Sequence, residues 1–264
     1  FNSQNIANTV WGFATIGYKI DSIKLDVFVS KVKLMLEELK VQDIISLLWS
    51  LAVLDFENVD ATDPFFSKIT EGYNSPINNE DDGRKLSTED LSELHQVSLW
   101  YNAEHEKISL LPPKLREESK LAFIACESRP SNLQKDVLKT FESLESLGLA
   151  IVGEEIHCNQ TGYSLDIVIG IKDTEKELAV EIDGPSHFMN CSPNGATTLK
   201  RRQIGSLGDR PLLSIPYWEW NESSYNINRK NQQTDSTIEM DHNTDEKKRK
   251  QYYLQKCLRQ VSFL

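Results

Sequence analysis

Hydrophobic and polar positions alternate with helical spacing in the first part of the chain. Residues 5–18 and 43–56 both carry apolar side chains three to four positions apart, and Trp11 aligns with Trp49 at an offset of 38 residues. Repeats of this length predict stacked helical pairs, in which each repeat buries the apolar face of its neighbour. We therefore expect an α-helical repeat region over residues 1–120, with both tryptophans in its core. Stacking of unpaired RNA bases on the two rings is the less favoured alternative.

The next pattern is a polar interval followed by a helix. Residues 57–86 are rich in polar and turn-forming side chains and are predicted to form a loop. Ser87 stands three residues before Asp90, which is typical of a capping box that begins a helix. We expect His95 in this helix to make an interhelix contact, and the prolines at 112–113 to mark its end.

From residue 131 the pattern changes to one helix followed by short strands. Ser131 is predicted to cap an amphipathic helix that ends at Gly148, and residues 150–157 form the first predicted strand. The short apolar segments 165–169 and 178–183 are separated by turn-forming and charged residues, so they are predicted to pair as an antiparallel hairpin.

The remaining pattern completes the predicted domain division. A strand is expected at 213–220, with Trp218 and Trp220 alternating along it. Residues 221–246 carry few apolar side chains and are predicted to be a disordered insertion before a last helix. We expect a linker at 121–130 and a small α/β domain at 131–264.

Three carboxylates lie in the predicted hairpin. Period-two alternation aims Glu181 and Asp183 at one side of a strand, and pairing of the two strands brings Asp166 towards them. Buried acids require a cation, a proton or hydrogen-bond donors. Converging carboxylates suit Mg²⁺, and such a metal site can hydrolyse a phosphodiester. A purely structural role is the alternative. In it Asp166 lies at a strand edge, Glu181 pairs with a cation of the segment 200–202, and Asp183 caps the turn that precedes His187.

Charge is unevenly distributed. The 264 residues carry a formal net charge of −11, which argues against the electrostatic attraction of a strongly basic nucleic-acid binder. From Lys200 onward, however, 12 Lys or Arg stand against 8 Asp or Glu, which gives +4 there and −15 in the first 199 residues. RNA is therefore expected to meet the C-terminal part of the chain. The predicted RNA-binding residues are Lys200, Arg201, Arg202, Lys247, Lys248 and Arg249.

Four blocks in fixed order carry a family resemblance. Segments 165–169, 178–188, 195–202 and 213–220, with Glu-x-Asp-Gly-Pro-x-His at the centre, resemble a RAP domain, the RNA-binding domain abundant in apicomplexan proteins. The resemblance covers about residues 160–260. It implies an α/β domain with the restriction-endonuclease-like fold, at the C-terminus of an organellar RNA-handling protein. The helical repeats resemble those of octotricopeptide-type and FAST-kinase-like proteins, which often precede a RAP domain.

The resemblance also assigns roles to the acids. Asp166 matches the first metal-binding acid of the nuclease pattern, and Glu181 opens its Glu-x-Lys element. Position 183 holds Asp in place of the Lys, and Lys200 is a substitute cation. Very-short-patch-repair-like nucleases use an Asp and a His near this place, which adds Asp183 and His187 as an alternative pair. The resemblance thus implies a catalytic set of Asp166, Glu181, Asp183 and His187, with Mg²⁺ as the metal if the chain is a nuclease.

Three functions stay open at this point. The first is an organellar RNA-binding protein that acts in RNA processing, RNA stability or ribosome assembly and function. It would bind rRNA or mRNA without a cofactor. Its partners would be ribosomal or other ribonucleoprotein components. The second is a metal-dependent RNA endonuclease, and the third is a structural component of a mitochondrial ribosome or another organellar ribonucleoprotein.

A mitochondrial location is expected, with the plastid as the alternative, although the chain begins with Phe and shows no targeting segment. No apolar run approaches the roughly 18 residues of a membrane span, so membrane insertion is not expected.

Overall fold

The structure, a computed structural model, describes residues 3–75, 86–126, 129–225 and 242–263. The chain divides into two compact units. The helical unit comprises Phe1–Glu127, Asn159–Tyr163 and His187–Leu207, and the sheet unit comprises Ser128–Cys158, Ser164–Ser186 and Gly208–Leu264. Sequence reasoning placed residues 131–264 in one domain, whereas here two of its segments, 159–163 and 187–207, group with the helical unit.

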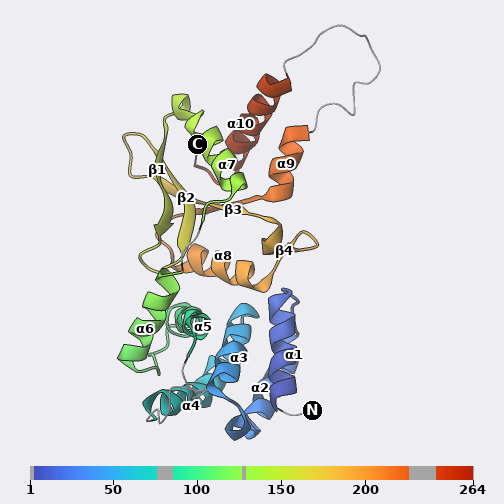
Figure 1. Cartoon of the computed structure of the whole chain (residues 1–264), viewed down its shortest axis with the longest axis vertical. Helices are drawn as coiled ribbons and strands as arrows, with labels where there is room; N and C mark the ends of the chain where they lie inside the picture. Colours follow the sequence, from blue (N-terminus) through green and yellow to red (C-terminus); the bar gives the residue numbers. More distant parts are fainter. Residues whose placement is uncertain (1–2, 76–85, 127–128, 226–241, 264) are drawn as a thin grey trace. The chain divides into compact units, whose positions relative to one another are not determined.

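Four helices begin the helical unit (Figure 1). They are α1 (Ser3–Thr15), α2 (Ser22–Leu34), α3 (Val41–Val53) and α4 (Asp63–Asn74). Both ends of α3 are offset from those of α1 by the 38 residues seen in the sequence. The loop predicted at 57–86 is wrong over α4, because Phe65 and Phe66 are buried in the core and Pro64 occupies the first turn, where its missing N–H costs nothing. Residues 76–85 of that loop lie outside the described residues.

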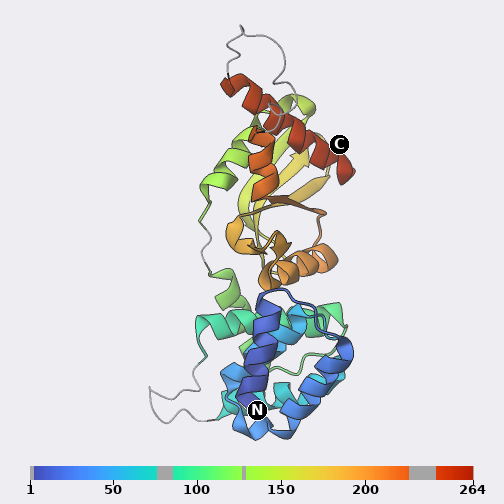
Figure 2. The ribbon, with the colours of Figure 1, turned by 90° about the vertical axis from the view of Figure 1, so that its right-hand side faces the viewer.

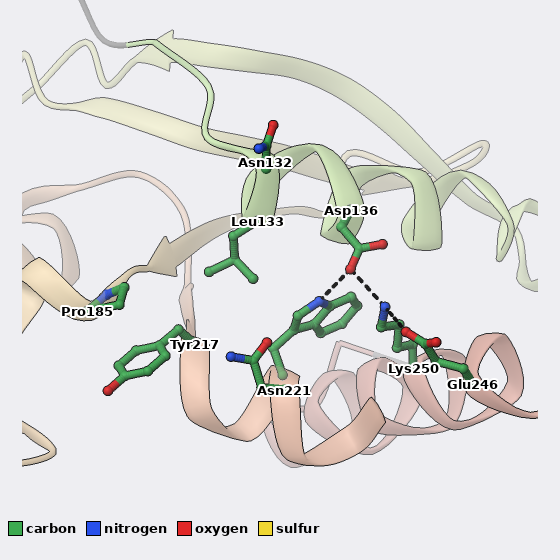
Figure 3. Close-up of a pocket in the computed structure, with 9 residues that line it drawn as sticks. Asn132, Leu133, Asp136, Pro185, Tyr217, Asn221, Glu246 and Lys250 are labelled. Atoms are coloured by element: carbon green, nitrogen blue, oxygen red, sulfur yellow. Dashed lines mark hydrogen bonds and ion pairs between the residues drawn. The ribbon is translucent and has the colours of Figure 1, made fainter. Parts of the chain in front are cut away.

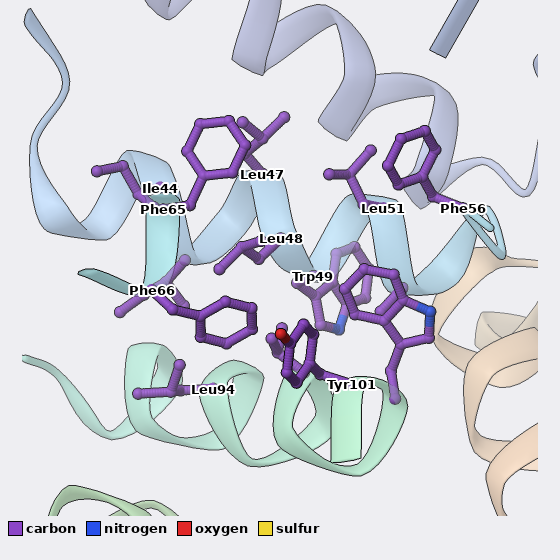
Figure 4. Close-up of a cluster of buried hydrophobic side chains, with 14 of the residues drawn as sticks. Ile44, Leu47, Leu48, Trp49, Leu51, Phe56, Phe65, Phe66, Leu94 and Tyr101 are labelled. Carbon is purple, nitrogen blue, oxygen red and sulfur yellow. The ribbon is translucent and has the colours of Figure 1, made fainter. Parts of the chain in front are cut away.

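The core of the helical unit gathers around α3 (Figure 4). Trp49 is 7% exposed, and its indole N–H donates to the side-chain oxygen of Gln96 at 2.7 Å. Its repeat partner Trp11 is 45% exposed. The prediction of a core tryptophan is therefore confirmed for Trp49 and wrong for Trp11, because α1 turns that ring away from the apolar seam.

Two further helices and a π-helical turn follow in the same unit. They are α5 (Thr88–Ser98), the π-helical turn Leu99–Glu104 and α6 (Pro113–Ile124). The capping box is confirmed, since Ser87 and Asp90 exchange side-chain and backbone hydrogen bonds. Pro113 begins α6 rather than ending a helix, so α6 occupies the start of the linker predicted at 121–130.

Residues 187–207 add a small hairpin and a helix to the helical unit. The hairpin pairs β4 (Phe188–Met189) with β5 (Ser192–Pro193), and α8 (Gly195–Leu207) follows. A Cβ on Gly195 would lie 2.0 Å from the carbonyl oxygen of Ala14 in α1, so only glycine permits this approach. Leu199 of α8 is part of the same hydrophobic core.

The sheet unit is a four-stranded mixed sheet with helices on one face (Figures 1 and 2). Its strands are β1 (Leu149–His157), β2 (Ser164–Ile171), β3 (Glu177–Asp183) and β6 (Leu212–Pro216), and its helices are α7 (Asn132–Glu142), α9 (Tyr217–Tyr225) and α10 (His242–Gln260). The order β1-β2-β3-β6 is antiparallel at the first two pairings and parallel at the last. The predicted hairpin of 165–169 with 178–183 is confirmed.

One hydrophobic core joins this sheet to its helices. Phe141 of α7 and Leu254 and Leu258 of α10 pack with Val180 of β3 and Ile215 of β6. The cap and the amphipathic pattern predicted after Ser131 are confirmed, with a capping box at Ser131. The predicted end at Gly148 is wrong, because α7 ends at Glu142 and Gly148 instead follows the 3-10 turn Glu145–Leu147. Among the helices that the structure describes, none is long and apolar enough to cross a membrane.

The segment after β6 corrects two predictions. Residues 217–225 form α9, so Trp218 and Trp220 lie on a helix rather than alternating along a strand. Residues 221–225 of the predicted disordered insertion belong to this helix, and α10 begins at His242, before the predicted start at Glu246. The rest of the insertion, residues 226–241, lies outside the described residues.

Candidate functional site

Glu181 and Asp183 share one face of β3, as predicted. Leu178, Val180 and Ile182 belong to the core under α7 and α10, so alternation along the strand places the two acids on the opposite face of the sheet. Both acidic residues are only 3% exposed. In this conformation neither carboxylate is presented to solvent.

Asp166 and Asp183 accept hydrogen bonds from the sheet itself. Asp166 lies on β2 next to Ile167, which pairs with Val180, and its Oδ2 accepts from the backbone N–H of Ile182 at 2.7 Å. The Oδ2 of Asp183 accepts from the hydroxyl of Ser214 on β6 at 2.5 Å. Each bond satisfies one oxygen of a carboxylate that is partly or fully removed from water.

The predicted metal site is not formed by this geometry. Within the described ranges, no three His, Cys, Asp or Glu side chains are grouped so that they could hold a metal ion. The donor set of Asp166, Glu181 and Asp183 therefore does not fit Mg²⁺ here, and no cleavage step follows from it. His187, the fourth predicted catalytic residue, belongs to the helical unit, where its Nδ1 lies 3.2 Å from the hydroxyl of Thr197.

Two of the predicted RNA-binding residues on α8 contact other side chains of the helical unit. Arg202 donates through Nε and Nη2 to the carboxylate of Glu104, at 3.0 to 3.3 Å, and its Nη2 also donates to the carbonyl of Ala52 at 2.6 Å. The guanidinium carbon of Arg201 lies 5.6 Å from the ring centroid of Phe188. Lys200 is half-buried.

The cations of α10 are more accessible. Lys247 and Lys248 are exposed, and Arg249 is half-buried. Lys250 instead forms ion pairs with Asp136 of α7 at 2.9 Å and Glu246 at 2.6 Å. Burial alone lowers the pKa of Lys250, but these two carboxylates outweigh it and raise the pKa above its ordinary value.

Sequence reasoning missed the periodicity of α10. Lys248, Tyr252, Lys256 and Arg259 are all exposed, and spacings of four, four and three residues place them on one side of a helix. We call these four residues the α10 stripe. The helical spacing of these four residues is visible in the sequence. The consecutive basic residues at 247–250 instead predict a site at one end of the helix rather than along one face.

The opposite side of α10 fixes the helix to the sheet unit. Leu254, Cys257 and Leu258 are buried in its core. The side-chain amide of Gln251 donates to the hydroxyl of Ser143 at 2.8 Å. This packing fixes the orientation of α10 about its own axis, so the α10 stripe faces solvent.

A pocket of about 540 Å³ lies between α7, α9 and α10 (Figure 3). Figure 3 shows Leu133, Pro185, Tyr217 and Asn221 around an open space, with a polar network on one side. In that network Asp136 accepts from the indole N–H of Trp220 at 2.8 Å and from Lys250. These bonds connect the three helices, so the polar groups on that side of the pocket also stabilise the unit.

The arrangement defines a small α/β unit with a buried acidic sheet face and an outward basic stripe on its last helix. No protein-family model matches the chain. Over 186 residues it is 30% identical to "RAP domain-containing protein, chloroplastic" of Oryza sativa subsp. japonica. The match covers 66% of this chain and 26% of the relative, so the chain spans about a quarter of that protein's length. This similarity supports a RAP domain in the chain.

Proposed function

We propose that this chain is an organellar RNA-binding protein whose sheet unit contacts RNA through α10. The observation that carries the proposal is the α10 stripe, which presents Lys248, Lys256 and Arg259 on one exposed side of a helix. The similarity to a RAP domain protein supports RNA as the ligand, because the RAP domain resembled by the sequence is an RNA-binding domain.

The net charge of −11 does not oppose this proposal. Phosphates respond to the local potential of a surface, and a basic stripe on one helix provides that potential within an acidic chain. Each cation that neutralises a phosphate releases condensed counterions, which favours binding at low salt. Lys247 also belongs to the exposed basic end of α10, whereas we assign no RNA contact to Arg202, whose donors bind Glu104 and Ala52.

The location and the cellular role are further parts of the proposal. The relative is named as chloroplastic, which favours a plastid over the mitochondrion expected from the sequence. We place the chain in RNA processing, RNA stability or ribosome function, with ribonucleoprotein partners. We also propose the restriction-endonuclease-like fold for the sheet unit, which the mixed order β1-β2-β3-β6 supports.

Salt-dependent binding of a labelled single-stranded RNA tests the proposal. The triple charge reversal Lys248→Glu, Lys256→Glu, Arg259→Glu is compared with the parent chain. Loss of three phosphate contacts should weaken binding and reduce the slope of log affinity against log salt by about two.

A matched control changes the net charge equally elsewhere on the sheet unit. Lys135 and Lys139 are exposed on α7, and Lys176 is exposed between β2 and β3. Their reversal to Glu should leave the salt slope close to that of the parent. Absence of RNA binding by the parent chain would refute the proposed function, and equal losses in the two triple variants would refute the assignment to α10.

A further inference from the structure

Tyr252 occupies the middle of the α10 stripe. Its side chain is 68% exposed, although a tyrosine ring normally gains stability from burial. Lys248 precedes it by one helical turn and Lys256 follows it by one turn, so the ring lies between two exposed cations on the same side of α10. An aromatic ring between exposed cations is the combination that holds nucleic acid with unpaired bases.

The exposure of Tyr252 follows from how α10 is held. The next residue, Tyr253, turns to the other side, where its hydroxyl donates to Glu219 of α9 at 2.9 Å. Its ring lies 6.0 Å from that of Trp220 in a T-shaped arrangement. Leu254 is fully buried one residue later. Rotation that buried Tyr252 would remove these contacts, so the sheet unit presents the ring to solvent as a fixed platform.

The length of the α10 stripe matches a short stretch of a single RNA strand. From Lys248 to Arg259 the helix rises about 16 Å, at 1.5 Å per residue. That length is comparable to several phosphates of one strand, which are about 3.4 Å apart along a stacked helix axis. One ring with cations on both sides can therefore contact a base while the neighbouring phosphates meet Lys248 and Lys256.

We propose that Tyr252 stacks on an unpaired base and that the ligand of the α10 stripe is single-stranded RNA. This inference rests on the proposed function and names its substrate class. In an RNA duplex the base faces are already covered by their neighbours, and the grooves offer phosphates and hydroxyls rather than an open base face. The cations alone attract both forms of RNA, whereas the ring adds affinity only for the single strand.

The test uses the full chain, a labelled oligo-uridine and a labelled duplex RNA of the same length. Tyr252→Ala should bind the oligo-uridine between about five and about a hundred times more weakly than the parent, with little change for the duplex. Tyr252→Phe keeps the ring and should stay within about twofold of the parent. Neither variant removes a charge, so the salt slope should not change.

Tyr18→Ala is the matched control, because Tyr18 is another exposed tyrosine, 58% accessible, in the helical unit. It should bind the oligo-uridine as the parent does. Parental affinity of Tyr252→Ala, or an equal loss on single-stranded and duplex RNA, would overturn the inference. If the charge reversal of the stripe weakens RNA binding while Tyr252→Ala does not, only the stacking role fails. If the parent binds neither RNA, the proposed function itself fails.

Discussion

Tyr252 and Tyr253 are consecutive residues of α10 with opposite surroundings. Tyr252 is largely exposed, whereas Tyr253 is half-buried and its hydroxyl donates to Glu219. Burial is the main cause that raises the pKa of the Tyr253 phenol far above its ordinary value, so this hydroxyl stays protonated and remains a donor. One tyrosine therefore stabilises the sheet unit while the other is available to a ligand.

The two tyrosines should differ in their effect on stability. Tyr253→Ala removes a ring packed between α9 and α10 and should lower the free energy of unfolding by about 2 kcal/mol. Tyr252→Ala should change it by less than about 0.5 kcal/mol, because that ring lies on the surface. Urea unfolding followed by circular dichroism measures both values. A larger loss for Tyr252→Ala would contradict the packing described for α10.

Arg202 should act on folding rather than on RNA affinity. Its guanidinium binds Glu104 and the carbonyl of Ala52, so Arg202→Ala leaves a nearly buried carboxylate and a backbone oxygen without these donors. We expect a loss of about 2 kcal/mol in the stability of the helical unit. Arg202→Lys should recover only part of it, because lysine lacks the planar fork. Weaker RNA binding without loss of stability would contradict the structural role.

His95 should make the helical unit sensitive to acid. Its Nε2 lies 2.8 Å from the carbonyl of Thr161 and its ring contacts Phe123 of α6, which confirms the predicted interhelix contact. Burial lowers the pKa of His95 below its ordinary value of 6.5. Below about pH 6.5 the unfolded chain therefore takes up a proton that the folded chain does not. Above that pH His95 is neutral in both the folded and the unfolded chain, so it causes no change of the unfolding free energy with pH.

The expected loss in unfolding free energy between pH 6.5 and 5.5 is up to about 1 kcal/mol. His95→Gln keeps a donor for Thr161, and this variant should be less stable at pH 7.5 but should depend less steeply on pH. Urea titrations at several pH values measure the difference. The same slope in parent and variant would assign the acid sensitivity to another group.

Asp166 should stabilise the sheet through its acceptor oxygen. Its Oδ2 accepts from the backbone N–H of Ile182, and Asp166→Ala removes that acceptor, which should cost about 1 to 2 kcal/mol. Asp166→Asn retains a carbonyl oxygen and should cost less. Thermal or urea unfolding of the two variants gives the comparison.

The endonuclease alternative makes a different prediction for the same sheet face. It requires cleavage of structured RNA with Mg²⁺ or Mn²⁺, and loss of the product in Glu181→Ala and Asp183→Asn. If α10 binds the RNA, these substitutions should change stability, since Asp183 accepts from Ser214, and should leave RNA affinity unchanged. Metal-dependent product that disappears in folded variants would make the carboxylates catalytic.

Local patterns predicted much of the fold because their causes are local. The capping boxes at Ser87 and Ser131 and the hairpin of β2 with β3 depend on residues close in sequence. Trp11 and Trp49 have similar neighbours in sequence, yet only Trp49 meets Gln96, which lies 47 residues away. The sequence alone does not reveal that contact, so the exposure of Trp11 was not predicted.

Contacts between residues far apart in the sequence also determine which side chains are available at the candidate site. Trp220 follows a strand but lies on α9, where its indole N–H reaches Asp136, 84 residues earlier in the chain. The basic neighbours of Arg202 predict an RNA contact, whereas its carboxylate partner Glu104 is 98 residues away in the sequence. The α10 stripe depends only on helical spacing, so a search for cations on one side of the last helix would have identified it.

Ultraviolet crosslinking of the native chain to single-stranded RNA, with the modified peptides identified by mass spectrometry, tests RNA binding by α10 most directly. We expect the main crosslinks in the peptide that contains Tyr252, and we expect the triple charge reversal of the stripe to remove them. Crosslinks confined to the helical unit, or unchanged by that reversal, would contradict RNA binding by α10.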